Sequence, residues 1–122
     1  MQDGDLRFLS PHHVRIIHDD QLDRYGGSAG IRDEGLLQSA CAQPLASFGG
    51  EFAHVTPAAI AAAYLFHIVR NHPFIDGNKR AGAATSLVFL KLNGIKFTIA
   101  PGELFDITMG VASGTNSKDD TI

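Results

Sequence analysis

The chain contains one cysteine, no tryptophan and no long uninterrupted apolar stretch. A single thiol, Cys41, cannot form an intramolecular disulfide or a cysteine zinc cluster, and it is typical of a reducing compartment. No apolar run approaches the roughly 18 residues of a membrane span, and the N-terminus lacks the basic and apolar regions of a signal peptide. We therefore expect a soluble, cytoplasmic protein that does not bind membranes.

Excess charge of either sign is also missing, because the formal net charge is -3 and the pI is about 6.0. Such a chain has no overall attraction for nucleic acid, so any anion must be bound by a local group of cations. Its 122 residues are enough for one hydrophobic core and too few for two ordinary domains. We therefore predict a single domain over residues 1–122 with no direct nucleic-acid partner.

Helix signals recur along the chain and predict a compact, mainly α-helical domain. Ser10 and Thr56 are good N-cap residues, and each is followed by a proline at the first helical position. The first signal predicts a helix that ends at Gly26. The second predicts a helix over 58–69, which is apolar on nearly every face and should lie buried at the centre of the domain.

Caps, breakers and periodicity predict the remaining elements. In chain order they are an ordered loop over 26–32, a helix capped by Asp33 and ended by Pro44, a loop over 45–55 that could act as a flap, a helix over 78–92, a short strand over 95–99, and a last helix to about 112.

Polar chemistry is concentrated in residues 72–83, between two alanine-rich apolar segments. His72 precedes a proline, which disfavours helical backbone, so the buried helix should end at about Asn71 and leave the imidazole in a loop. There it could deprotonate an attacking hydroxyl as a general base. A lone histidine more often has a plain surface or core role, but these neighbours favour catalysis. The histidines predicted to lie on the surface are His12, His13, His18 and His54.

Two residues that follow His72 have contrasting chemistry. Phe74 is apolar within a polar loop, and its burial should anchor that loop by about 1.5–3 kcal/mol. Asp76 offers a hard oxygen ligand for Mg²⁺, an ion that usually takes only one or two protein carboxylates and shares phosphate oxygens. The alternative role for Asp76 is to cap the helix that follows.

The start of the next helix has the composition of a phosphate site. Gly77 and Asn78 allow successive backbone N–H groups to converge on an anion, with help from the helix dipole. Lys79 and Arg80 place two cations in the first turn, where the dipole disfavours them unless an anion is bound. The lysine ammonium acts as a point charge and the arginine guanidinium can bind two phosphate oxygens, so the pair suits phosphoryl or nucleotidyl transfer. Neither a Walker loop nor a His-Glu-x-x-His string occurs in the chain.

The string His-Pro-Phe-Ile-Asp-Gly-Asn-Lys-Arg at 72–80 resembles the Fic superfamily motif, most closely that of the death-on-curing (Doc) toxin branch. Further Doc-like signposts at 26–33 and 89–94 extend the resemblance over nearly the whole chain. It implies a Fic/Doc-type helical bundle that uses ATP as co-substrate and Mg²⁺ as cofactor. The roles it implies are base for His72, loop anchor for Phe74, magnesium ligand for Asp76, and phosphate ligands for Gly77, Asn78, Lys79 and Arg80.

The resemblance also bears on the reaction. Fic enzymes typically transfer AMP to a hydroxyl, whereas Doc toxins phosphorylate a threonine of translation elongation factor Tu and are blocked by a small antitoxin. Lys79 replaces the glycine usual in AMP-transferring members, and Ala83 stands where they have a second arginine, so both residues favour the kinase. The self-inhibitory string Ser/Thr-x-x-x-Glu-Gly/Asn is absent, which favours a separate antitoxin as the inhibitor.

Three functions remain open at this point. The leading hypothesis is a toxin kinase that phosphorylates a protein hydroxyl and arrests translation, and the alternative within enzymes is AMP transfer. The third is a catalytically silent nucleotide- or protein-binding module. It is motivated by the C-terminus, because Doc-like chains usually continue with a further helical segment, so the resemblance implies a truncation after Ile122.

Overall fold

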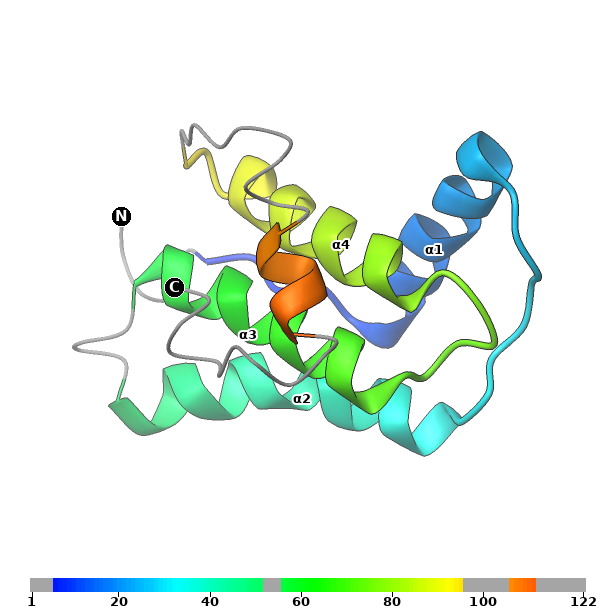
Figure 1. The fold of residues 1–122 in the computed structure, drawn as a ribbon. Helices are drawn as coiled ribbons and strands as arrows, with labels where there is room; N and C mark the ends of the chain where they lie inside the picture. The colour runs from blue at the N-terminus through cyan, green and yellow to red at the C-terminus, as the bar shows by residue number, and fades with distance from the viewer. Residues whose placement is uncertain (1–5, 52–55, 96–105, 112–122) are drawn as a thin grey trace.

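The protein is described by a computed structural model that covers residues 6–51, 56–95 and 106–111. The described residues form four long helices. Figure 1 shows α3 between α2 on one side and α4 on the other, and α1 beside α4. Their bounds are α1 Pro11–Tyr25, α2 Glu34–Glu51, α3 Pro57–Asn71 and α4 Asn78–Leu92. A short helical segment, 106–111, follows (orange in Figure 1).

The predicted all-α class is confirmed for the part of the chain that the structure describes. Pairing between extended segments there is limited to one isolated antiparallel bridge, between Ile31 and Phe74. None of the described helices is both long and apolar enough to cross a membrane.

Helix α3 forms the centre of the core, as its sequence predicts. The Thr56 hydroxyl accepts a hydrogen bond from the Ala59 N–H, and Pro57 occupies the first turn, so the predicted cap is present. Eight of its residues are buried: Ile60, Ala61, Ala62, Ala63, Tyr64, Leu65, Ile68 and Val69. The 106–111 segment packs on this helix, because Val111 clusters with Leu65 and Val69.

Helices α1 and α4 also have the predicted bounds. The Ser10 side chain caps α1, and Gly26 ends it with a positive φ of 81°. Helix α4 ends at Leu92, where Asn93 and Gly94 form a turn. Side-chain capping places the start of α1, whereas α4 starts at Gly77 without a capping side chain.

The prediction that Pro44 ends the second helix is wrong, because α2 continues through it to Glu51. Proline in a helix interior removes one hydrogen bond and costs about 3 kcal/mol. The Pro44 ring is fully buried, however, and α2 packs along α3, so tertiary packing offsets that cost. The loop predicted over 45–55 is accordingly helical as far as residue 51.

Four other expectations fall wholly or partly outside the described residues. They concern 52–55 of the predicted loop, the surface position of His54, 96–99 of the predicted strand, and the limits of the last helix. Of that last helix the structure describes 106–111, which is helical as predicted.

Candidate active site

The loop that joins α3 to α4 begins with a strained residue. His72 caps the end of α3 in left-handed backbone, with φ 53° and ψ 54°, and its N–H donates to the Ile68 carbonyl at 3.2 Å. Helix α3 therefore ends at Asn71, as the Pro73 signal predicts. His72 is exposed.

Phe74 and Asn78 hold the middle of this loop. The Phe74 side chain is only 1% exposed. The Phe74 N–H donates to Asn78 Oδ1 at 2.8 Å, and Asn78 Nδ2 donates to the Phe74 carbonyl at 2.9 Å. Because both ends of the buried Asn78 amide bind the Phe74 backbone, the backbone N–H is the group of this residue best placed to meet an anion.

The Asp76 carboxylate is held by two backbone N–H groups. Oδ2 accepts from Ser28 N at 3.0 Å, and Oδ1 accepts from Gly77 N at 2.9 Å. These two bonds, with the Ser28 bond the stronger influence, lower the pKa of Asp76 below its ordinary value of 3.8. Asp76 does not cap α4, because the N-cap is Gly77 and no side chain bonds that helix start. Asp76 is therefore an exposed carboxylate that is ionised at neutral pH.

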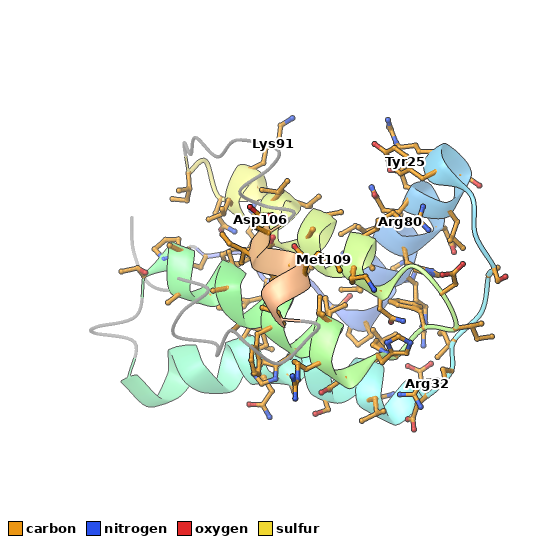
Figure 2. The ribbon with its side chains drawn as sticks, in the orientation of Figure 1. Tyr25, Arg32, Arg80, Lys91, Asp106 and Met109 are labelled. Carbon is orange, nitrogen blue, oxygen red and sulfur yellow. The ribbon has the colours of Figure 1, made fainter. Side chains whose placement is uncertain are left out.

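The first turn of α4 combines free donors with two cations. Gly77 adopts φ 78° and starts the helix, whose first N–H groups have no acceptor within the helix. Lys79 is exposed, and Arg80 is half-buried with its guanidinium over the Tyr25 ring at 5.9 Å. Figure 2 shows Arg80 and Tyr25 at the same end of the molecule, where α4 begins and α1 ends. The aromatic ring restrains the guanidinium without neutralising it.

These groups face one cleft of about 580 Å³, a volume typical of small-molecule sites. The cleft is lined by the α3–α4 loop, the first turns of α4 and the 106–111 segment, through His72, Ile75, Asp76, Gly77, Asn78, Lys79, Arg80, Ala83, Thr108 and Met109. Every polar residue singled out in the sequence motif thus lines the same cleft. Phe74 lies beneath it in the core.

Hydrogen bonds join the connection between α1 and α2 to the loop between α3 and α4. Arg32 N and Asp33 N both donate to the Pro73 carbonyl, at 2.7 and 3.0 Å, and Ile75 N donates to the Gly30 carbonyl at 3.1 Å. The Arg32 guanidinium donates to the His72 carbonyl at 2.7 Å, where a cation also complements the α3 dipole. Segment 26–33 therefore forms a strap that is hydrogen-bonded along the loop.

Sequence reasoning missed three residues of the site region. The prediction that His18 is on the surface is wrong, because its side chain is 2% exposed and lies against Phe74. Its neighbours Asp19 and Asp20 are exposed and charged, so the local composition hid the buried face of α1. Thr108 and Met109 line the cleft although they are far along the chain, and no local signal could have placed them there.

Substitution of Gly27 should disturb Asp76 directly. A Cβ at Gly27 would lie 2.7 Å from Asp76 Oδ2 and 2.9 Å from Leu22 Cδ2, so the carboxylate must shift and its hydrogen bond from Ser28 N is disturbed. We expect Gly27→Ala to raise the pKa of Asp76 toward its ordinary value, measured by NMR titration. Since the lowered pKa stabilises the fold above about pH 4 and that stabilisation is lost as pH falls through the folded-state value, the variant should also lose part of this acid dependence.

Gly26→Ala is the matched control. Gly26 also has a positive φ, 81°, but a Cβ there meets nothing within 4 Å. Both variants strain the backbone, and only Gly27→Ala clashes with the carboxylate. Equal Asp76 pKa values in the two variants would contradict the predicted role of the Ser28 bond.

Comparisons with known proteins agree with the motif and the geometry. The family model described as "Fic/DOC family" matches residues 8–90. "Protein kinase doc" of Escherichia phage P1 is 34% identical over 110 residues, which cover 89% of this chain and 85% of that protein. "Toxin Doc" of Mycolicibacterium smegmatis is 42% identical over 72 residues, 59% of this chain and 55% of that protein. Since the family model covers more than half of its residues, the chain belongs to the Fic/DOC family.

Proposed function

We propose that this protein is the toxin of a toxin–antitoxin pair and that it transfers the γ-phosphoryl group of ATP to a protein hydroxyl. The observation that carries the proposal is the cleft in which His72, Asp76 and the two cations of α4 meet. A histidine, a carboxylate and cations on a helix start are the groups that phosphoryl transfer requires. The relatives named as a kinase and as a toxin support the same assignment.

His72 is the proposed general base. Its exposed imidazole takes the proton of the target hydroxyl as the oxygen forms a bond to the γ-phosphorus. The bond from that phosphorus to the β–γ bridging oxygen breaks, and ADP leaves. Lys79, Arg80 and the free N–H groups of the first α4 turn bind the phosphate oxygens and offset the charge on them.

The residues present fit a Mg²⁺ ion bound together with phosphate. Asp76 is ionised and exposed, and each of its oxygens accepts only one protein hydrogen bond. Among the described residues there is no group of three His, Cys, Asp or Glu side chains that could enclose an ion. One carboxylate, phosphate oxygens and water are the usual ligands of such Mg²⁺, which would neutralise phosphate charge in the site.

Ala83 bears on the choice between phosphoryl and AMP transfer. It lines the cleft and packs against the apolar cluster of Leu65, Val69 and Val111. The AMP-transferring members that the motif resembles have a second arginine at the position of Ala83. A methyl group supplies no charge for the α- or β-phosphate, so the cleft favours the kinase. AMP transfer remains the second candidate, because the motif residues other than Lys79 and Ala83 are shared.

Labelled ATP distinguishes the two reactions. We propose elongation factor Tu as the target, from the resemblance to Doc toxins, and expect label from the γ-phosphate and none from the α-phosphate to stay on it. Asp76→Asn should remove most of the label, whereas the exposed Asp23→Asn on α1 should retain it. Retention of the α label alone would replace the kinase by AMP transfer.

The toxin assignment has its own test. Expression of the chain in a host cell should stop growth, and co-expression of the neighbouring open reading frame should restore it, as expected for a cognate antitoxin. Growth that is unaffected by the chain would favour a silent binding module.

A further inference from the structure

A buried histidine outside the motif, His18, is hydrogen-bonded to the backbone of Asp76 in the α3–α4 loop. His18 of α1 is 2% exposed, and its Nε2 lies 2.7 Å from the carbonyl oxygen of Asp76. Because a carbonyl can only accept, Nε2 carries the proton and donates it. The His18 ring is also stacked on Phe74, with centroids 3.8 Å apart and an angle of 5° between the planes.

This hydrogen bond acts on the same peptide unit that orients the Asp76 side chain. The carbonyl that accepts from His18 and the Gly77 N–H that donates to Asp76 Oδ1 belong to one planar peptide group. Fixing the oxygen of this group therefore fixes the direction of its N–H. The N–H in turn holds one carboxylate oxygen, and Ser28 N holds the other.

We propose that His18 is the positioning residue for the Asp76 carboxylate. Its Nε2–H hydrogen bond holds the Asp76–Gly77 peptide plane, and stacking on Phe74 holds the His18 ring in place. Ser28, in the 26–33 strap, holds the carboxylate through its backbone N–H. The inference rests on the proposed role of Asp76 as the metal ligand, and His18 itself touches neither metal nor substrate.

Two substitutions separate the hydrogen bond from the stacked ring. His18→Phe keeps an aromatic ring of similar size against Phe74 and removes the donor. His18→Gln keeps an N–H donor of similar reach and removes the ring. His12→Phe is the matched control, because His12 is an exposed histidine on the same helix. A residue that only fills space would be replaced better by phenylalanine than by glutamine, and a positioning donor predicts the reverse.

Amide hydrogen exchange of the full chain tests the positioning without any activity. In His18→Phe we expect the Ser28 and Gly77 amides to exchange about tenfold faster, as loss of one hydrogen bond implies, with no such change at the core amide of Ile68. In His18→Gln the two amides should keep their parent rates relative to Ile68. Unchanged rates in His18→Phe, equal acceleration at Ile68, or selective acceleration in His18→Gln would each overturn the proposal.

Binding of Mn²⁺ alone, followed by NMR line broadening, then tests whether the positioning of Asp76 by His18 affects metal binding. We expect the Mn²⁺ concentration for half-maximal broadening near Asp76 to rise several-fold in His18→Phe and to return toward the parent value in His18→Gln. Equal midpoints in all variants would overturn the link to the metal. If the parent protein itself shows no broadening near Asp76, the proposed metal role fails, whereas the exchange result still decides whether His18 positions the loop.

Discussion

Replacement of His72 by alanine is expected to slow phosphoryl transfer by about 10²- to 10⁴-fold and to abolish growth arrest, while the protein stays folded. The imidazole is exposed in the cleft, so its removal takes little from the core. Asp76 cannot replace it, because the bonds from Ser28 and Gly77 lower its pKa and make it a weak base at neutral pH. The measurements are initial rates with labelled ATP and growth after induction.

The backbone at this position calls for a second variant. His72 has φ 53°, and left-handed backbone suits asparagine better than alanine. His72→Asn should therefore be at least as stable as His72→Ala and equally inactive, which separates loss of the base from backbone strain. His12→Ala, at an exposed site outside the cleft, should behave as the parent. A His72→Asn protein that still arrests growth would show that His72 is not the base.

Phe74→Ala should give the largest loss of stability among single substitutions in the loop. Phe74 is 1% exposed and stacked on His18, so truncation leaves a cavity and removes the support of the loop. Phenylalanine-to-alanine changes in cores cost about 3–5 kcal/mol, and we expect the free energy of unfolding to fall by that amount. Urea denaturation of the full chain measures it.

The next residue in the chain provides the control for this substitution. Ile75 is 55% exposed, so Ile75→Ala should change the free energy of unfolding by no more than about 0.5 kcal/mol. An unchanged melting temperature in Phe74→Ala would show that Phe74 does not anchor the loop. A loss in Ile75→Ala as large as that in Phe74→Ala would show that the loop depends on its exposed residues instead.

Several structural features were predictable because they depend on neighbours along the chain. Ser10 and Thr56 cap helices with their own side chains, Gly26 ends one with a positive φ, and the apolar composition of α3 requires burial. The polar motif was readable for the same reason. Six consecutive loop residues and the first turn of α4 are close in sequence, so their proximity in space follows from chain geometry alone.

Other features depend on partners that are distant in the chain. Pro44 predicts a helix end locally, but its burial in α2 keeps it in a helix. The backbone N–H of Asn78 was predicted to face an anion, and no local pattern indicated that its side chain would bind the Phe74 backbone. His18 is the clearest case, because its charged neighbours on α1 predict an exposed residue. In each case tertiary packing decides the environment of the residue, and local sequence propensity does not include that packing.

The amino-acid order alone was enough to establish the helical class, the caps, the buried central helix and the identity of the chemical groups in the motif, since each follows from interactions over a few residues. The tertiary structure decided how those groups are held. It brought Ser28 and His18 to the loop and Met109 to the cleft, from three separate segments, and it set the orientation of Asp76. Orientation depends on directed hydrogen bonds between distant backbone groups, and these exist only after the helices have packed.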